Sequence, residues 1–300
     1  MSLKSLSKEL QDSIDKIIEK EKYKKYDIAV KKFETHGNNF LGGLYEIDIT
    51  GETTEGKKNT NVFVKQQNPM EYLKLLPLND LYLNEVFIYN DLSKVFTTLQ
   101  DEANVPQDER FIIAKAYEET NNNQLILENL SKKGFRTYGK LEDISIKYAQ
   151  LSIQQMAKFH ALSFDGDAAE VIPIDYQFIN YGCPVMDFLL FIFTSTDREF
   201  RKKHLNDLKE LYFETLSSFL KYFNMDVEAV YPRKEFEKVY TEWLDFGLMM
   251  TLFYSYVLFA PDTGIDLGKV PVSELPICPD KKYDVFYRGL IDDFVEWGHL

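Results

Sequence analysis

The fold of this chain is decided by one stretch of sequence, HGNNFLGGLYEIDITGETTEGKKNTNVFVK (His36–Lys65). The runs Leu44–Thr50 and Asn61–Gln66 are rich in β-branched and aromatic residues, which favour strands. The connection Gly51–Thr60 has the glycines, asparagine and threonines that are typical of an exposed hairpin loop. We therefore expect these two strands to pair antiparallel, with a glycine-containing turn in front of them.

The strand pattern extends in both directions from this hairpin, between Tyr26 and Asn129. It includes the runs FIIAKAY (Phe111–Tyr117) and QLILEN (Gln124–Asn129). One helix, expected over Asn79–Phe96, interrupts the strands, because apolar residues recur there near helical spacing. The segment Met1–Tyr26 predicts an exposed amphipathic helix of mixed charge and contains no secretory signal.

The second half of the chain has a helical pattern, with apolar residues recurring at the spacing of an amphipathic helix. A chain of 300 residues that is 45% hydrophobic exceeds what one compact domain usually needs. We expect an α+β fold with two lobes. Residues 1–129 form a small antiparallel sheet with the N-terminal helix, and residues 130–300 form a mostly helical lobe, with the boundary between Asn129 and Lys140.

Charge and composition exclude several classes of partner and site. The 48 acidic and 35 basic residues give a net charge of -13, which repels nucleic acid and anionic lipid headgroups. The apolar run Gly247–Ala260 is shorter than the roughly 20 residues that span a bilayer, so we expect a buried core helix there. Cys183, Cys278 and the histidines are too scattered for a disulfide framework or a zinc site. We expect a cytoplasmic protein with reduced thiols and no structural metal.

A lysine at a strand end and an acid inside a helix form a candidate nucleotide-binding pair. Lys65 ends the strand NVFVK, and Glu85 lies in the middle of LNEVFIY. In kinases a lysine in this position contacts phosphate oxygens, and a helix carboxylate pairs with it and fixes its long stem. Gly37, Gly42 and Gly43 in the preceding turn are candidates for a loop over the phosphates. Each signal alone also fits a solvated lysine, unrelated surface charges or an ordinary hairpin, whereas their order favours a nucleotide lobe.

The most specific signal is IDYQFINYGCPVMDF (Ile174–Phe188). A strand ending at Asp175 is followed by a short loop and by Gly-x-Pro-x-x-Asp leading into an apolar helix. An acid at a strand end can hold Mg²⁺ through oxygen ligation, so Asp175 is the candidate metal ligand. Asp187 stands at the mouth of the next helix, where we expect it to cap exposed backbone N–H groups, a structural role.

In these motifs and their order the chain resembles the ecdysteroid kinase-like family. GNNFLGGLYEI, VFVK and NEVFIY are similar to its nucleotide lobe, and LILENLSKKGF (Leu125–Phe135) is similar to its hinge. MAKFHALSF (Met156–Phe164) resembles the first large helix of its C-terminal lobe, and IDYQFINYGCPVMDFLLFIFTS (Ile174–Ser195) resembles its metal-binding segment. A more distant similarity extends to choline and aminoglycoside kinases.

The resemblance implies a bilobal protein-kinase-like fold, with ATP and Mg²⁺ as cofactors. It implies phosphorylation of a hydroxyl group on a small molecule, with ecdysteroids or similar lipophilic alcohols as acceptors. Glu128, in the hinge, joins Lys65, Glu85 and the three glycines as a candidate for binding the nucleotide.

The chain departs from the family's pattern between Phe164 and Asp165. Members that it resembles carry there a long helical stretch ending in a His-Gly-Asp…Asn catalytic loop, and no His-Gly-Asp triplet occurs in this sequence. The loop aspartate would orient and deprotonate the attacking hydroxyl, and the asparagine would help to hold Mg²⁺. Asp165 and Asp167 fit a hairpin turn, and His160 fits a packed or hydrogen-bonded histidine, so we assign no catalytic residue.

The sequence leaves three hypotheses open. The chain is an ATP-dependent small-molecule kinase with impaired activity, or it is a nucleotide-binding pseudokinase or splice form without catalysis. The third is a truncated product that folds poorly, because deleting packed helices exposes apolar surface in a shortened C-terminal lobe.

Overall fold

The computed structural model describes residues 3–33, 42–67, 78–136, 142–164, 182–258 and 281–300. The chain divides into two compact units, and each is described by itself. Described residues of the first unit lie in Met1–Lys94 and Ile113–Thr137, and those of the second lie in Val95–Ile112, Tyr138–Pro261 and Val272–Leu300. The chain leaves the first unit after residue 94 and returns to it at residue 113.

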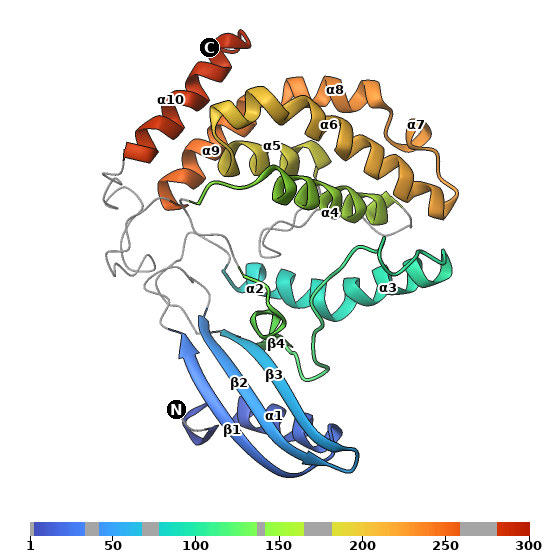
Figure 1. The fold of residues 1–300 in the computed structure, drawn as a ribbon, viewed down its shortest axis with the longest axis vertical. Helices are drawn as coiled ribbons and strands as arrows, with labels where there is room; N and C mark the ends of the chain where they lie inside the picture. The colour runs from blue at the N-terminus through green and yellow to red at the C-terminus, as the bar shows by residue number, and fades with distance from the viewer. Residues whose placement is uncertain (1–2, 34–41, 68–77, 137–141, 165–181, 259–280) are drawn as a thin grey trace. The chain divides into compact units, whose positions relative to one another are not determined.

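A four-stranded antiparallel sheet in the order β1-β2-β3-β4 forms the first unit (Figure 1). Its strands are β1 (Tyr23–Phe33), β2 (Gly42–Thr53), β3 (Gly56–Gln67) and β4 (Gln124–Glu128). The predicted β2–β3 hairpin is confirmed, with Leu44 opposite Lys65. Its strands are longer than expected, because pairing continues to Thr53 and Gly56 and most of the predicted loop is strand. Gly56 follows the turn at φ 117°, a region that favours glycine.

Helix α1 (Lys8–Lys20) covers one face of this sheet. The helix begins after Ser7, whose side chain accepts a hydrogen bond from the Leu10 N–H. Leu10, Ile14 and Ile17 are buried in one core with strand residues Val30, Ile47, Ile49, Val62, Val64 and Ile126. The amphipathic helix is confirmed, but the expectation that it is exposed is wrong, because its apolar side packs on the sheet.

Helix α2 (Leu78–Phe87) packs against the side chains of β4 that point away from α1. Tyr82 and Val86 form a second buried cluster with Leu125. Successive strand residues point to opposite faces, and the neighbouring Ile126 belongs to the α1 core, so α2 and α1 contact opposite faces of the sheet.

The helix continues from α2 through η2 (Ile88–Leu92), a π-helical turn, into α3 (Ser93–Glu102). The predicted helix over residues 79–96 is therefore confirmed and ends later than expected. The run Phe111–Tyr117 is not a strand of the sheet; through Ala116 it makes an isolated bridge to β4.

Helices dominate the second unit (Figure 1). They are the part of α3 from Val95 onward, α4 (Ile146–Phe164), α5 (Pro184–Ser195), α6 (Arg198–Leu220), α7 (Val227–Val230), α8 (Arg233–Glu242), α9 (Leu244–Leu258) and α10 (Lys281–Glu296). Short 3-10 turns occur at Leu3–Ser5 and Leu130–Lys133 in the first unit and at Lys221–Phe223 in the second. Phe188, Tyr212 and Phe236 are buried with their rings in contact. The protein thus has the expected α+β fold, an antiparallel sheet in the N-terminal part and helices in the C-terminal part.

Helix α9 is only partly the buried core helix that we expected. Leu248 and Thr251 are buried, whereas Met249 and Phe253 are 58% and 55% exposed. Over the residues that the structure describes, none of the helices has the length and apolar character to cross a membrane.

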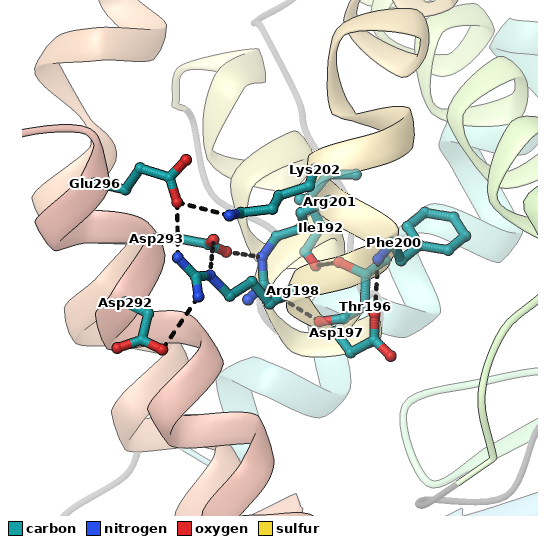
Figure 2. Close-up of polar contacts among 10 residues, drawn as sticks. All are labelled: Ile192, Thr196, Asp197, Arg198, Phe200, Arg201, Lys202, Asp292, Asp293 and Glu296. Atoms are coloured by element: carbon teal, nitrogen blue, oxygen red, sulfur yellow. Dashed lines mark hydrogen bonds and ion pairs between the residues drawn. The ribbon is translucent and has the colours of Figure 1, made fainter.

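Charged side chains attach helix α10 to the start of α6 (Figure 2). The Asp293 carboxylate accepts a hydrogen bond from Arg201 Nε at 2.7 Å and another from Arg198 Nε at 3.0 Å. The side chains of Arg201 and Asp293 are each 1% exposed. At the surface, Arg198 also donates to Glu296 at 2.7 Å. A buried ion pair and a surface network therefore connect the two helices.

Candidate functional site

Lys65 and Glu85 form a close ion pair within the first unit. Lys65 Nζ lies 2.5 Å from Glu85 Oε2, and the two side chains are 10% and 11% exposed. Lys65 lies near the end of β3, where it pairs with Leu44 of β2 and Leu125 of β4. The structure therefore brings the predicted pair together, and its role toward a nucleotide stays a prediction.

Helix α2 positions Glu85 through a neighbouring tyrosine one turn earlier. The Tyr82 hydroxyl donates a hydrogen bond to the Lys65 carbonyl at 3.0 Å, and the whole side chain is buried. Burial raises the pKa of Tyr82 well above its ordinary value, so the hydroxyl remains a donor. Because residues three apart lie on one helix face, this bond holds Glu85 over the same strand.

The glycines of the predicted phosphate loop are described only in part. Gly42 and Gly43 begin β2 and pair with Gln67 and Gln66 of β3. A Cβ on Gly43 would lie 2.8 Å from the Tyr45 hydroxyl, so a larger residue would displace that ring. Gly37 lies outside the described residues.

Glu128 ends β4, and its carboxylate is already engaged. It accepts a hydrogen bond from the Lys115 N–H at 2.9 Å and pairs with Lys133. Burial pushes the pKa of Glu128 upward, but these two partners outweigh it, and the pKa lies below its ordinary value. Its part in binding a nucleotide stays a prediction.

A polar cluster that the sequence did not predict lies between β2 and the segment Leu125–Phe135, which we call the hinge segment. Lys132 Nζ lies 2.9 Å from Glu46 Oε1 and 3.0 Å from Asp48 Oδ2. Asn129 Nδ2 donates to Glu46 Oε2 at 3.0 Å. We call Glu46, Asp48, Asn129 and Lys132 the hinge clasp. The available signal was the alternation of two acids on β2 together with a lysine in the hinge motif.

The metal site predicted from the sequence rests on one carboxylate. Asp175, the candidate ligand, lies outside the described residues, as do Asp165 and Asp167. Among the residues that are described, no group of three or more histidine, cysteine, aspartate or glutamate side chains could hold a metal ion. The Mg²⁺ ligand therefore stays a prediction from sequence.

His160 and Asp187 form a buried polar centre in the second unit. His160 Nε2 lies 3.2 Å from Asp187 Oδ2, and His160 Nδ1 lies 2.7 Å from the Tyr212 hydroxyl. The expectation of a packed, hydrogen-bonded histidine is confirmed. Burial raises the pKa of Asp187, and the contact with His160 opposes that rise.

The expectation that Asp187 caps a helix is wrong. The N-cap of α5 is Cys183, which makes no side-chain capping bond, and Pro184 begins the helix. Asp187 therefore lies within the first turn, where it is buried against His160 rather than directed at the free backbone N–H groups.

Comparison with known proteins gave one family. The protein-family model of the ecdysteroid kinase-like family matches residues 36–167 and 164–225, which together span more than half of the chain. Searches of curated proteins and of solved structures gave no match. The matched region contains the predicted nucleotide-binding residues from Gly37 to Glu128 as well as Asp175. The chain therefore belongs to the ecdysteroid kinase-like family.

Proposed function

We propose that this chain binds ATP with Mg²⁺ and that side chains of its N-terminal unit contact the nucleotide. The observation that carries the proposal is the buried Lys65–Glu85 pair at the end of β3. Membership of a kinase-like family supports it, because phosphoryl transfer relies on a lysine that contacts the phosphates and on an acid that orients this lysine.

The residues present fit a nucleotide in two respects. The Lys65 ammonium is held by the Glu85 carboxylate of helix α2. Because its side chain is already ordered, placing it on phosphate oxygens costs less conformational entropy. Gly42 and Gly43, the described glycines of the predicted phosphate loop, lie at the start of β2 directly before Leu44, which pairs with Lys65. Bound Mg²⁺ would neutralise phosphate charge, and Asp175 is our proposed ligand for it.

The chain is best explained as a nucleotide-binding pseudokinase or splice form. No His-Gly-Asp triplet occurs in the sequence, so the residue that would deprotonate an acceptor hydroxyl is missing. Loss of a general base alone costs roughly 10²- to 10⁴-fold in rate, and loss of a metal ligand adds to this. The family match in two segments that meet at residues 164–167 supports a missing stretch at Phe164.

The second candidate is the complete family reaction, transfer of the ATP γ-phosphoryl group to a hydroxyl of a small lipophilic acceptor such as an ecdysteroid. Family membership favours it. It requires another group to accept the hydroxyl proton.

Thermal unfolding with and without Mg-ATP tests the binding proposal. We expect Mg-ATP to raise the thermal unfolding midpoint of the wild-type protein. A ligand at about 100 times its Kd stabilises the folded state by about 2.7 kcal/mol. Lys65→Met should abolish the rise. Lys58→Met is the matched control, since Lys58 lies on the same strand and pairs with Glu21 at the other end of the sheet.

A rise in Lys65→Met equal to that of the wild type, or no rise in the wild type, contradicts the proposal. Turnover of ATP with ecdysone as the acceptor separates the two candidates. Phosphorylated ecdysone that depends on Lys65 would establish the kinase, and binding without product would establish the pseudokinase.

A further inference from the structure

Strand β1 forms one edge of the sheet (Figure 1). It pairs with β2 on one side, and over the described residues no strand pairs with its outer side. Lys24 is the extra residue of an irregularity at the start of the strand, and from Lys25 to Phe33 the register is unbroken. This regular part contains no proline, so its outer backbone N–H and C=O groups are available to a further strand.

The opposite edge of the sheet, at β4, is already bonded. The Tyr117 N–H donates to the Ile126 carbonyl at 2.8 Å, and the Glu128 N–H donates to the Lys115 carbonyl at 2.9 Å. Within the part of the chain that the structure describes, β1 is therefore the edge at which the sheet can be extended.

Lysines give this edge a positive charge in an acidic chain. Lys24, Lys25, Lys31 and Lys32 are all exposed, and Asp27 is the one acid of the strand. The strand therefore carries a charge of +3, whereas the whole chain carries -13. Among the described residues, these four lysines make no ion pair.

Lysines on an edge strand ordinarily prevent its pairing with another edge of the same kind. Here the occupied side of β1 also indicates which strand would be accepted. Lys25 lies opposite Glu52 of β2, and Lys31 lies opposite Glu46. Opposite charges in facing positions stabilise a pair of strands, and like charges destabilise it. An acidic strand on the outer side repeats the arrangement that β2 already makes.

The spacing of the lysines defines the partner segment. Lys25 and Lys31 are six residues apart, which places them on one face and roughly 20 Å apart along the strand. Between them lies Tyr26, a residue that is 45% exposed and can pack on a β-branched side chain of a neighbouring strand. The complementary segment therefore has acids near both ends and uncharged, strand-forming residues in the middle.

We propose that the outer side of β1 binds an extended acidic segment of a partner protein, which adds to the sheet as a further strand. Backbone hydrogen bonds hold the segment, and the lysines select it by its charge. None of the residues proposed to contact the nucleotide belongs to β1, so the binding of this segment and the binding of Mg-ATP are measured separately.

Fluorescence anisotropy with the labelled peptide EEVTVTVEE tests the proposal. We expect saturable binding to the wild type that weakens as salt screens the exposed charges. The peptide KKVTVTVKK should not bind, because its lysines would face those of β1. N-methylation of the five central residues of EEVTVTVEE keeps its charge and removes backbone donors, so binding should weaken by about tenfold or more.

Lys25→Gln combined with Lys31→Gln should weaken binding by about fivefold, because two facing charge pairs are lost. The matched control is Lys94→Gln combined with Lys115→Gln, which removes the same charge from two exposed lysines of this unit outside β1. Thermal unfolding without peptide verifies that each variant is folded. If the first variant is not folded, Lys32→Gln carries the test.

Three results would overturn the proposal. The wild type could fail to bind EEVTVTVEE, the N-methylated peptide could bind as tightly as the parent, or the β1 variant could bind as tightly as its control. Tighter binding of a single-stranded oligonucleotide or of anionic lipid vesicles than of the peptide would also refute it, because the lysines would then serve another class of partner.

Discussion

The Lys65–Glu85 pair has lost most of its water, since both side chains are about nine-tenths covered at a separation of 2.5 Å. Taking two charges out of water costs several kcal/mol for each ion, and their attraction repays this only in good geometry. Such a pair is weak evidence for stability. A role in binding explains its burial better.

The pH dependence of stability should reveal the clasp at the residue scale. The pKa of Glu46 is lowered in the folded protein, chiefly by Lys132, so the stability from this pair is present above the unfolded pKa, near 4.5, and is lost as the pH falls through the folded pKa. Between about pH 5 and pH 3, Glu46→Gln should therefore lose less unfolding free energy than the wild type.

Denaturant unfolding at a series of pH values measures this difference. The control variant is Glu52→Gln, which changes an exposed carboxylate of the same strand. Its unfolding free energy should change with pH as that of the wild type does. Equal slopes for the wild type and Glu46→Gln would show that Lys132 does not stabilise the Glu46 carboxylate.

Side-chain pairs could be predicted from the sequence where the order of strands and helices determines which residues meet. Lys65 and Glu85 follow from a strand end and a helix centre, and the structure pairs them. The clasp did not follow, because the approach of Lys132 to Glu46 depends on a turn conformation that spacing does not reveal. Asp187 was misassigned because α5 begins at Pro184, a shift that turns the carboxylate from the helix end into the core.

At the scale of elements, polar strands were hard to recognise. Gly51–Thr60 has the composition of a loop, yet its residues continue the β2–β3 pairing almost to the turn. Composition fails there because the end of a long hairpin exposes side chains on both faces and needs no apolar alternation. The run Phe111–Tyr117 shows the reverse case. Its composition is typical of a strand, but it makes only an isolated bridge to β4, at Ala116.

The attachment of α10 should depend on one buried carboxylate. Asp293→Asn leaves Arg201 with an uncompensated charge at 1% exposure and should lower the unfolding free energy by about 3–5 kcal/mol. The neighbouring Asp292 also faces Arg198, but its side chain is 58% exposed, so Asp292→Asn should cause no measurable change. Denaturant unfolding of both variants checks the contrast.

Similar losses for Asp293→Asn and Asp292→Asn would contradict the buried pair as the attachment. The double variant Arg201→Met with Asp293→Asn adds a second criterion. Removing both charges should cost less than the sum of the single changes, because no unpaired charge remains.

For the whole molecule, sequence and structure agree on class and differ in detail. An antiparallel sheet followed by helices was predictable from the change of apolar period near residue 129. The excursion of residues 95–112 into the helical unit was not, because it depends on contacts such as the packing of Phe96 and Phe111 on Phe159. Tertiary contacts of this kind leave no periodic signal.

Labelling with an acyl-phosphate derivative of ATP tests the central claim most directly. The reagent transfers its acyl group to lysines beside bound phosphates, and peptide mass spectrometry locates the modified residue. We predict acylation of Lys65 that excess Mg-ATP prevents, with Lys58 unprotected. An unmodified Lys65, or a modification of Lys65 that Mg-ATP does not reduce, would show that this chain does not bind the nucleotide phosphates at the Lys65–Glu85 pair.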